Sequence, residues 1–401
     1  MIRIVAGTYE GLLYGWELPV TAKKPTKMKL TFGYSAHAEC IKSVSLMTAK
    51  EGKTLISGGN DEMIKIYNVN KRVEVGTLME HKGAVTCLEF FGQSHMLSGS
   101  ADNSICIWRT SDWNCLHILG GHKAEITSMA VHPSGKLAFS VARDRTLRMW
   151  NLVKGRIAYI RRLEKEASSV VMSQSGSRYA LSFGSDVSVF SSANAEVVGM
   201  LEHSDKVHAA VFATDEYVVC GGEDKCIYVW KATGSLVAKV THADIISRIR
   251  CMEVVYARGA EELPWIVVAS SSGAVQVWDL ADFTFDDESP EEANKDVTPL
   301  VSTTLLSKPR VTCLSACVAS SDDKDASGKA KTKKTVKKVK KVEVTKISAA
   351  ESAAAPRVVV EIEDKTETVV KTTTTEKSNA PNKRKAKQQG QNGKKKKAAK
   401  Q

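Results

Sequence analysis

Residues 95–108 read HMLSGSADNSICIW, and variants of this block recur through most of the chain. Its small polar cluster GSAD is typical of a tight turn, and ICIW is a β-branched and aromatic run typical of a strand. The block therefore predicts two strands joined by a turn, the second of which ends at an aromatic residue, Trp108.

The closing aromatic residue recurs at a nearly constant interval. Seven strand-like segments end at Trp16, Tyr67, Trp108, Trp150, Phe190, Trp230 and Trp278, with gaps of 51, 41, 42, 40, 40 and 48 residues. A repeat of roughly 40–45 residues is the signature of WD-repeat propeller blades, whereas a helical solenoid would space its apolar residues by about 3.6. We therefore predict an all-β, seven-bladed WD-repeat β-propeller.

Polar residues stand at fixed distances from the aromatic position in four repeats. An aspartate precedes the aromatic residue by six positions, a serine or cysteine precedes the aspartate by four, and a histidine opens the repeat. The predicted structural network comprises His37, Ser57, Asp61 and Tyr67; His81, Ser98, Asp102 and Trp108; His122, Ser140, Asp144 and Trp150; and His203, Asp224 and Trp230. We expect these side chains to satisfy one another, because an unpaired buried polar group costs roughly 1–3 kcal/mol.

Two repeats have lost this pattern. The repeat that ends at Phe190 has Gly184 in place of the aspartate and no opening histidine, and the repeat that ends at Trp278 has Ser272 there. Strand alternation survives in both segments, so both are predicted to form blades.

The two ends of the predicted ring are expected to share one blade. Residues 2–8, 11–18 and 28–32 read as three strands, one fewer than a blade needs, and residues 310–318 (RVTCLSACV) are the candidate for the missing strand. Pairing that segment with the N-terminal hairpin closes the ring and leaves no free sheet edge around it.

Charge divides the chain near residue 318. Residues 319–401 carry 23 Lys and Arg against 10 Asp and Glu, which leaves 34 basic and 35 acidic residues for 1–318. The basic part has no Trp, Tyr or Phe and cannot bury enough apolar surface to fold alone. We predict a propeller domain over residues 1–318 and a disordered, lysine-rich tail over residues 319–401.

The sequence predicts no catalytic, cofactor or metal site. It contains no HExxH or GxSxG motif, and the His–Asp pairs recur at one spacing in four repeats, which a structural network explains better than a catalytic pair. Nine cysteines without CxxC pairs favour a reduced intracellular compartment. No apolar run approaches the roughly 18 residues of a membrane helix.

Two groups of basic residues are candidates for RNA contact. The tail contributes Lys383, Arg384, Lys385, Lys394, Lys395, Lys396 and Lys397, and the repeat that ends at Trp150 contributes, with its exit, Arg143, Arg145, Arg148, Arg156, Arg161 and Arg162. Arginines that share a face form a patch able to bind phosphates, and scattered solvated arginines are the alternative. The tail clusters also resemble nuclear-targeting sequences, and RNA binding through them would depend strongly on salt.

An acidic stretch lies before the closing strand. Residues 282–296 (DFTFDDESPEEANKD) hold seven acidic residues and one lysine. We predict a flexible excursion, and the alternative is a segment that folds over the basic tail or a basic partner until RNA competes.

Three longer stretches resemble one family. IVAGTYEGLLYGWEL (4–18), GAVTCLEFFGQSHMLSGSADNSICIW (83–108) and HPSGKLAFSVARDRTLRMWNLVKGRIAYI (132–160) are similar to the PAK-interacting-protein-like WD-repeat family. The third stretch is the most specific, since generic WD repeats lack its TLRMWNLVKGR segment. The likeness spans about residues 2–318. It implies a role in nucleolar assembly of the large (60S) ribosomal subunit and, for some members, inhibition of p21-activated kinases.

These observations predict a non-enzymatic scaffold of the nucleus and nucleolus, monomeric within a large complex and without membrane association. The ring would bind ribosome assembly factors or ribosomal proteins, while the tail binds pre-ribosomal RNA and adds avidity. One rival is a signalling adaptor that binds and inhibits a p21-activated kinase. A substrate-recognition ring for ubiquitin transfer would need an F-box-like docking helix, which the sequence does not show.

Overall fold

The computed structural model describes residues 1–20, 27–257, 262–286, 290, 292–294, 296–305 and 307–319. No helix within these ranges is long and apolar enough to cross a membrane. The chain divides into two units, Met1–Gly328 and Lys329–Gln401. The predicted tail beyond Ala319, including its seven candidate RNA-contact residues, lies outside the described ranges, and the domain boundary near residue 318 stays a prediction.

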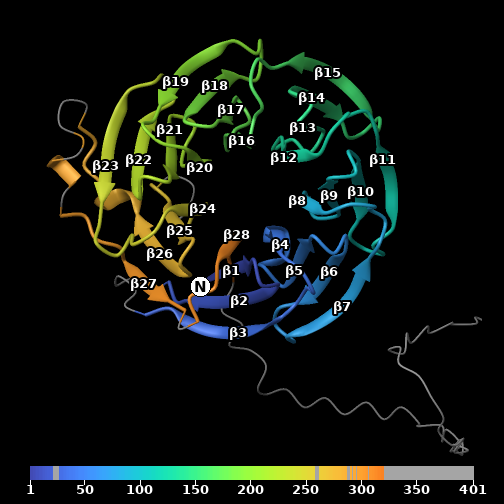
Figure 1. Ribbon diagram of the computed structural model, residues 1–401, viewed down its shortest axis with the longest axis horizontal. Coiled ribbons are helices and arrows are strands. Elements are labelled where there is room, and N and C mark those ends of the chain that lie inside the picture. The colour runs from blue at the N-terminus through green and yellow to red at the C-terminus, as the bar shows by residue number, and fades with distance from the viewer. Residues whose placement is uncertain are drawn as a thin grey trace, which may run out of the picture. The chain divides into compact units, whose positions relative to one another are not determined.

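Seven four-stranded antiparallel sheets stand around one axis as the blades of a propeller (Figure 1). Blade 1 is ordered β28 (Val311–Val318), β1 (Ile2–Thr8), β2 (Leu12–Leu18) and β3 (Lys29–Ser35). Blade 2 holds β4 (Ile41–Leu46), β5 (Thr54–Gly59), β6 (Ile64–Asn68) and β7 (Val73–Leu78), and blade 3 holds β8 (Val85–Phe91), β9 (His95–Ser100), β10 (Ile105–Arg109) and β11 (Cys115–Leu119). Blade 4 holds β12 (Ile126–Val131), β13 (Leu137–Ala142), β14 (Thr146–Asn151) and β15 (Arg156–Arg162).

The remaining blades follow the same order from the axis outward. Blade 5 holds β16 (Ser169–Met172), β17 (Arg178–Phe183), β18 (Asp186–Ser191) and β19 (Val197–Glu202). Blade 6 holds β20 (Val207–Phe212), β21 (Tyr217–Gly222), β22 (Cys226–Lys231) and β23 (Leu236–Thr241), and blade 7 holds β24 (Ile249–Val255), β25 (Trp265–Ser270), β26 (Ala274–Asp279) and β27 (Val301–Thr304). Three 3₁₀ turns, η1 (Thr48–Lys50), η2 (Leu280–Asp282) and η3 (Glu292–Asn294), complete the described elements. The all-β, seven-bladed prediction is confirmed, and the two repeats without the aspartate are complete blades.

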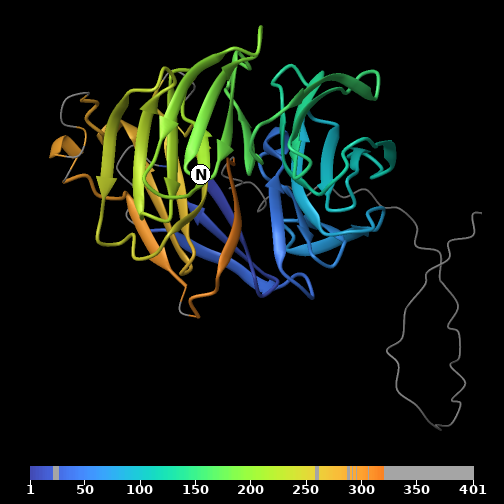
Figure 2. The same cartoon turned by 45° about the horizontal axis from the view of Figure 1, so that its top comes forward.

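Burial follows the position of a strand in its blade. In β25 all six residues are buried, because a middle strand has a strand on each side and a neighbouring blade against each face. By contrast, the first half of the outer strand β7 is exposed. Figure 2 shows the strands running between the two faces of the ring, where the loops gather.

The ring closes as the sequence predicts. Strand β28 pairs antiparallel with β1 from Ile2↔Val318 to Thr8↔Val311. Beyond the strands, the Met1 amino group donates to the Ala319 carbonyl at 2.9 Å, and the Ala319 N–H donates to the Met1 carbonyl at 2.7 Å. The first and last described residues are therefore joined in one sheet.

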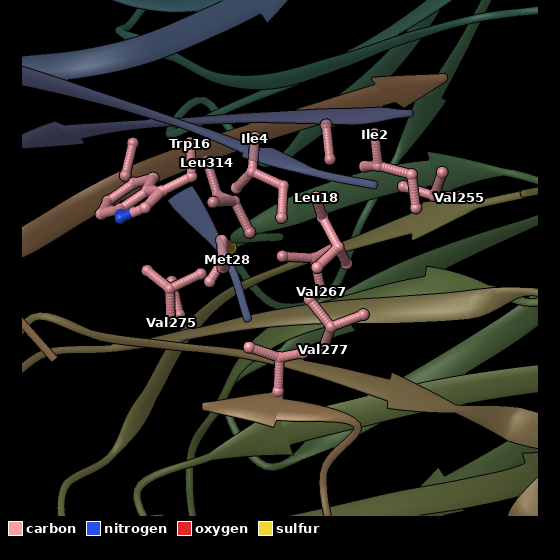
Figure 3. Packing of buried hydrophobic residues seen from close by; sticks show 14 of the residues in the cluster. Ile2, Ile4, Trp16, Leu18, Met28, Val255, Val267, Val275, Val277 and Leu314 are labelled. Atoms are coloured by element: carbon pink, nitrogen blue, oxygen red, sulfur yellow. The ribbon is translucent and has the colours of Figure 1, made fainter. Parts of the chain in front are cut away.

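Apolar side chains fill the space between blades. Figure 3 shows Ile2, Ile4 and Trp16 of blade 1 beside Val267 and Val277 of blade 7, and all five belong to one buried cluster. Burying a side chain of this size contributes roughly 1.5–3 kcal/mol. Blade 1 therefore depends on its neighbour for stability, and this dependence runs around the whole ring.

The described part of the acidic stretch is packed, which differs from the predicted flexible excursion. Phe283 is buried, and Phe285 stacks on Tyr217 of blade 6 with ring centroids 4.8 Å apart. The Asp286 N–H donates to the Val237 carbonyl on β23 at 2.9 Å. Two aromatic side chains within the acidic composition anchor this segment, because apolar burial outweighs the tendency of charged residues to stay solvated.

Candidate functional site

Blade 3 holds a continuous chain of hydrogen bonds. His81 Nε2 lies 2.7 Å from Ser98 Oγ, His81 Nδ1 lies 3.0 Å from Asp102, and Trp108 Nε1 donates to Ser98 Oγ at 2.8 Å. Because Ser98 accepts from the indole, its hydroxyl is free to donate to Nε2, which leaves Nδ1–H to donate to the carboxylate. The four predicted residues are thus brought together, linking the turn between β9 and β10 to the loop before β8.

Blade 4 repeats this geometry. His122 lies 2.7 Å from Ser140 and 3.0 Å from Asp144, and Trp150 donates to Ser140 at 2.8 Å. Asp144 also accepts from the Thr146 hydroxyl at 2.6 Å and from the Lys123 N–H at 3.0 Å. Burial raises the pKa of Asp144, but these hydrogen bonds outweigh burial and hold that pKa at about 2.

Sequence reasoning missed the hydroxyl residue that completes each of these two networks. Thr146 in blade 4 and Ser104 in blade 3 both lie two positions after the aspartate, and the Ser104 hydroxyl donates to Asp102 at 2.6 Å. The sequence did contain a signal for these residues, because an aspartate followed two residues later by Ser or Thr is a turn motif with a local hydrogen bond.

Blades 2 and 6 form only part of the predicted network. In blade 2, His37 lies 2.9 Å from Asp61 and 2.6 Å from Ser57, whereas the buried Tyr67 hydroxyl has no hydrogen-bond partner in the described part of the chain. Burial lowers the pKa of His37, so its imidazole group is neutral near pH 7.

In blade 6 the predicted link between His203 and Asp224 is missing. Trp230 Nε1 donates directly to His203 Nε2 at 3.0 Å, and His203 Nδ1 has no partner among the described residues. Cys220 stands where blades 2 to 4 have serine, and because a thiol is a weak hydrogen-bonding group, no hydroxyl bridges the indole and the imidazole. The Tyr228 ring packs edge-on against His203, with ring centroids 5.0 Å apart.

The six predicted RNA-contact arginines do not share one face. Arg148 is 7% exposed and lies 4.0 Å from Asp144, so it belongs to the interior of blade 4. Arg143 pairs with Glu125 at 3.2 Å. Arg156 and Arg162 lie at opposite ends of β15, since Arg156 pairs with Asn151 and Arg162 with Thr146.

Arg161 packs on the aromatic residue of blade 5, the blade that lacks the network. Its guanidinium lies 4.8 Å from the centroid of the Phe190 ring and donates to the Ala195 carbonyl at 2.8 Å. Behind it, Phe139, Tyr179 and Phe190 form a stack with centroids 5.1 Å apart at each step. Arg145 and Arg162 are both exposed and close together, because the Leu163 N–H bonds to the Arg145 carbonyl, and Arg143 in the same turn is exposed but paired with Glu125.

Two carboxylates lie beside the axis of the ring. Glu89 on β8 and Glu253 on β24 occupy equivalent positions, each four residues after a fully buried residue at the start of its strand. Burial raises the pKa of Glu89 to about 7. Burial, and then repulsion from Glu89, raises the pKa of Glu253 to about 8.

The Glu253→Gln variant is expected to melt several degrees above the natural protein at pH 8.5 and close to it at pH 5. The folded-state pKa of about 8 exceeds the ordinary 4.5, so the unfolded chain loses this proton first. Stability therefore falls as pH rises between these values and levels off above about 8. Melting curves across this range measure the effect, with the exposed Glu202→Gln as control. A difference that does not change with pH would contradict the assignment.

The outer strands expose apolar side chains around the rim of the ring. Val73 and Val75 on β7, Ile118 on β11, Tyr159 and Ile160 on β15, and Val197 and Met200 on β19 are each 46–60% exposed. Contiguous exposed apolar patches are typical of surfaces that bind other proteins, and these side chains are the apolar groups that the rim offers for such contacts.

Seven four-stranded blades, with His–Ser–Asp–Trp networks in two of them, define a WD-repeat β-propeller. In agreement, the family described as "WD domain, G-beta repeat" matches residues 28–68, 72–109, 113–151 and 195–231. The chain belongs to the p21-activated protein kinase-interacting-protein-like WD-repeat family of scaffold proteins. Its relatives cover most of the ring, so the resemblance seen in the sequence is confirmed.

Three relatives illustrate this membership. The p21-activated protein kinase-interacting protein 1-like protein of Gallus gallus is 33% identical over 333 residues, which cover 82% of this chain and 85% of the relative. The p21-activated protein kinase-interacting protein 1 of Homo sapiens is 28% identical, and the match covers 78% of this chain and 76% of the relative. Protein MAK11 of Saccharomyces cerevisiae is 28% identical, and the match covers 57% of this chain and 62% of the relative.

Proposed function

We propose that this protein is a non-catalytic scaffold in the nucleolar assembly of the large (60S) ribosomal subunit. The proposal rests on where the side chains of the blades lie, with polar pairs inside the blades and apolar groups on the rim. Within the described residues, the His–Asp pairs of blades 2 to 4 are committed to internal networks, while the outer strands present exposed apolar side chains. A rigid ring with such a rim suits simultaneous contacts with several proteins, here ribosome assembly factors and ribosomal proteins.

The RNA contact is assigned to the tail. Residues 319–401 carry a net charge of +13, whereas residues 1–318 carry −1, so the attraction of the chain for phosphate is concentrated beyond the ring. Arg145 and Arg162, which are exposed at one end of blade 4, are the remaining candidates on the ring. A weak RNA contact and a weak protein contact in one chain reinforce each other through effective concentration.

Sedimentation of cell extracts tests the assembly role. We expect the tagged full-length protein to co-sediment with nucleolar precursors of the large subunit. A chain that ends at Ala319 should shift toward the light fractions. Crosslinking to RNA should give signal for the full chain and lose most of it without residues 320–401. A full-length protein found only in light fractions would contradict the proposal. Crosslinks that persist in the shortened chain would move the RNA contact to the ring.

The second candidate is an adaptor that binds and inhibits a p21-activated kinase, and the names of the vertebrate relatives favour a kinase partner. Such an adaptor would stay in the light fractions, co-purify with the kinase and lower its activity when added in stoichiometric amounts. Addition of the purified chain to an active p21-activated kinase therefore separates the two functions, because an assembly scaffold leaves the kinase rate unchanged.

A further inference from the structure

One position at the start of the inner strands divides the ring into two arcs. It directly follows a buried residue in every blade, at the end of the ring where the networks lie. From blade 1 to blade 7 it is occupied by Thr312, Lys42, Thr86, Thr127, Ser168, His208 and Arg250. Blades 3, 4 and 5 thus carry hydroxyls. Blades 6, 7 and 2 carry basic side chains and form the basic arc, in which Thr312 of blade 1 lies between blades 7 and 2.

The hydroxyl side chains at this position form hydrogen bonds within their own blades. All four donate to the carbonyl of the adjacent strand of their own blade. The bonds run from Thr86 to Gly99 at 3.1 Å, from Thr127 to Val141 at 3.2 Å, from Ser168 to Ser182 at 3.1 Å and from Thr312 to Gly7 at 3.1 Å. The longer side chains of Lys42 and Arg250 are instead exposed at the mouth of the central channel.

The charges of the basic arc are only partly balanced. Arg250 lies 3.3 Å from His208 Nδ1, and His208 Nε2 lies 2.8 Å from Glu223, which also pairs with Arg248 at 2.9 Å. No acidic partner within the described residues pairs with Lys42 or Lys206. Lys42 and Arg250 flank Thr312, because the Thr312 hydroxyl donates to the Ile41 carbonyl and the Cys251 thiol donates to the Thr312 carbonyl at 3.2 Å.

A cavity of about 490 Å³ opens at this place. Its lining includes Lys206, His208, Arg250, Ser168, Thr312 and Glu253. Lys42 lies outside this lining, next to Ile41, whose carbonyl accepts from the Thr312 hydroxyl. Because burial raises the pKa of Glu253 to about 8, its carboxyl group is largely protonated at pH 7 and does not repel an anion. The cavity therefore combines strand-mounted cations and hydroxyls with an acidic group in its neutral form.

We propose that this channel mouth binds a small oligophosphate anion such as pyrophosphate through Lys42, Lys206 and Arg250. The planar guanidinium of Arg250 donates two parallel hydrogen bonds to phosphate oxygens, and the two lysines add point charges. Lys42 and Arg250 project from strands, so their backbone is already ordered and binding restricts only the side chains. The site is separate from the basic tail and does not depend on the proposed role in ribosome assembly.

Calorimetry with pyrophosphate on the full-length chain tests the site. The variant Lys42→Gln/Lys206→Gln/Arg250→Gln should lose affinity by roughly tenfold or more, because it removes every unbalanced cation of the mouth. The control Lys71→Gln/Lys154→Gln/Arg109→Gln removes the same charges from the turns at the opposite ends of the blades, and its affinity should change less than about twofold. The tail is identical in all these proteins. Equal losses in both variants, or none in either, would overturn the proposal.

A second variant keeps the proposal testable should the triple variant fail to fold. Between pH 7 and pH 9 Glu253 ionises, and the titratable groups that interact with it are Glu89, Cys251 and Cys317. Relative to the natural protein, Glu253→Gln should bind pyrophosphate with the same affinity at pH 7 and several-fold more tightly at pH 9. Ionisation of pyrophosphate itself affects both proteins alike. Identical pH profiles would overturn the site.

Discussion

A chain that ends at Lys308 is expected to lose its cooperative fold. The deletion removes β28, so β1, whose seven residues are all buried, becomes an open edge. It also removes Val311 and Leu314 from the cluster between blades 1 and 7. Each of these side chains contributes roughly 1.5–3 kcal/mol, and the lost strand pairing adds to a total comparable with the roughly 5–15 kcal/mol that stabilises a domain. Thermal unfolding followed by circular dichroism should show no sharp transition, and the chain should aggregate.

The matched control is a chain that ends at Ala319. It keeps β28 and the two hydrogen bonds between Met1 and Ala319, so its melting temperature should lie within a few degrees of the full-length value. The comparison separates closure of the ring from loss of the basic tail. A chain ending at Lys308 that melts cooperatively at the control temperature would show that β28 does not hold the ring closed.

Asp144→Ala is expected to destabilise the ring by roughly 2–4 kcal/mol, because it breaks a buried network and leaves several donors without acceptors. The donors are His122 Nδ1, the Lys123 N–H and both the N–H and hydroxyl of Thr146. Chemical denaturation of the full-length protein measures the change in free energy of unfolding.

Two other aspartates provide controls for this effect. Asp186 lies in blade 5 and pairs with the exposed Lys165 at 3.0 Å, so Asp186→Ala should cost well under about 1 kcal/mol. Asp224 does not bond to His203, and Asp224→Ala should cost less than Asp144→Ala for that reason. Equal losses at all three positions would mean that the hydrogen-bonded network is not the source of stability in blade 4.

Much of this architecture could be predicted from local pattern. The interval between Trp108 and Trp150 reports one blade, because each blade is a supersecondary unit with its own strands and turns. The closing strand was readable as well, since the segment around Cys313 alternates like a strand and the N-terminal hairpin lacked a partner. The sets around His81 and His122 could be located because all their members fall within a single repeat.

Features that depend on one altered atom or on a neighbouring blade were not readable in this way. Cys220 removes the hydroxyl that would bridge His203 and Trp230, and Asp224 does not bond to His203, although the histidine, aspartate and tryptophan keep their spacing. Arg161 lies on β15 of blade 4 but stacks on Phe190 of blade 5, and no spacing rule connects the two. Phe283 and Phe285 anchor a stretch whose composition indicated solvation.

The amino-acid sequence by itself determined the number of blades, their strands and the residues that join first to last, since these follow from periodicity and turn chemistry within each repeat. Only the tertiary structure decided which polar groups meet across blades, including the arc of Lys42, His208 and Arg250 around the channel. The physical reason is that curvature of the ring brings together strand ends far apart in the chain, and hydrogen bonding and charge act over a few ångströms in space.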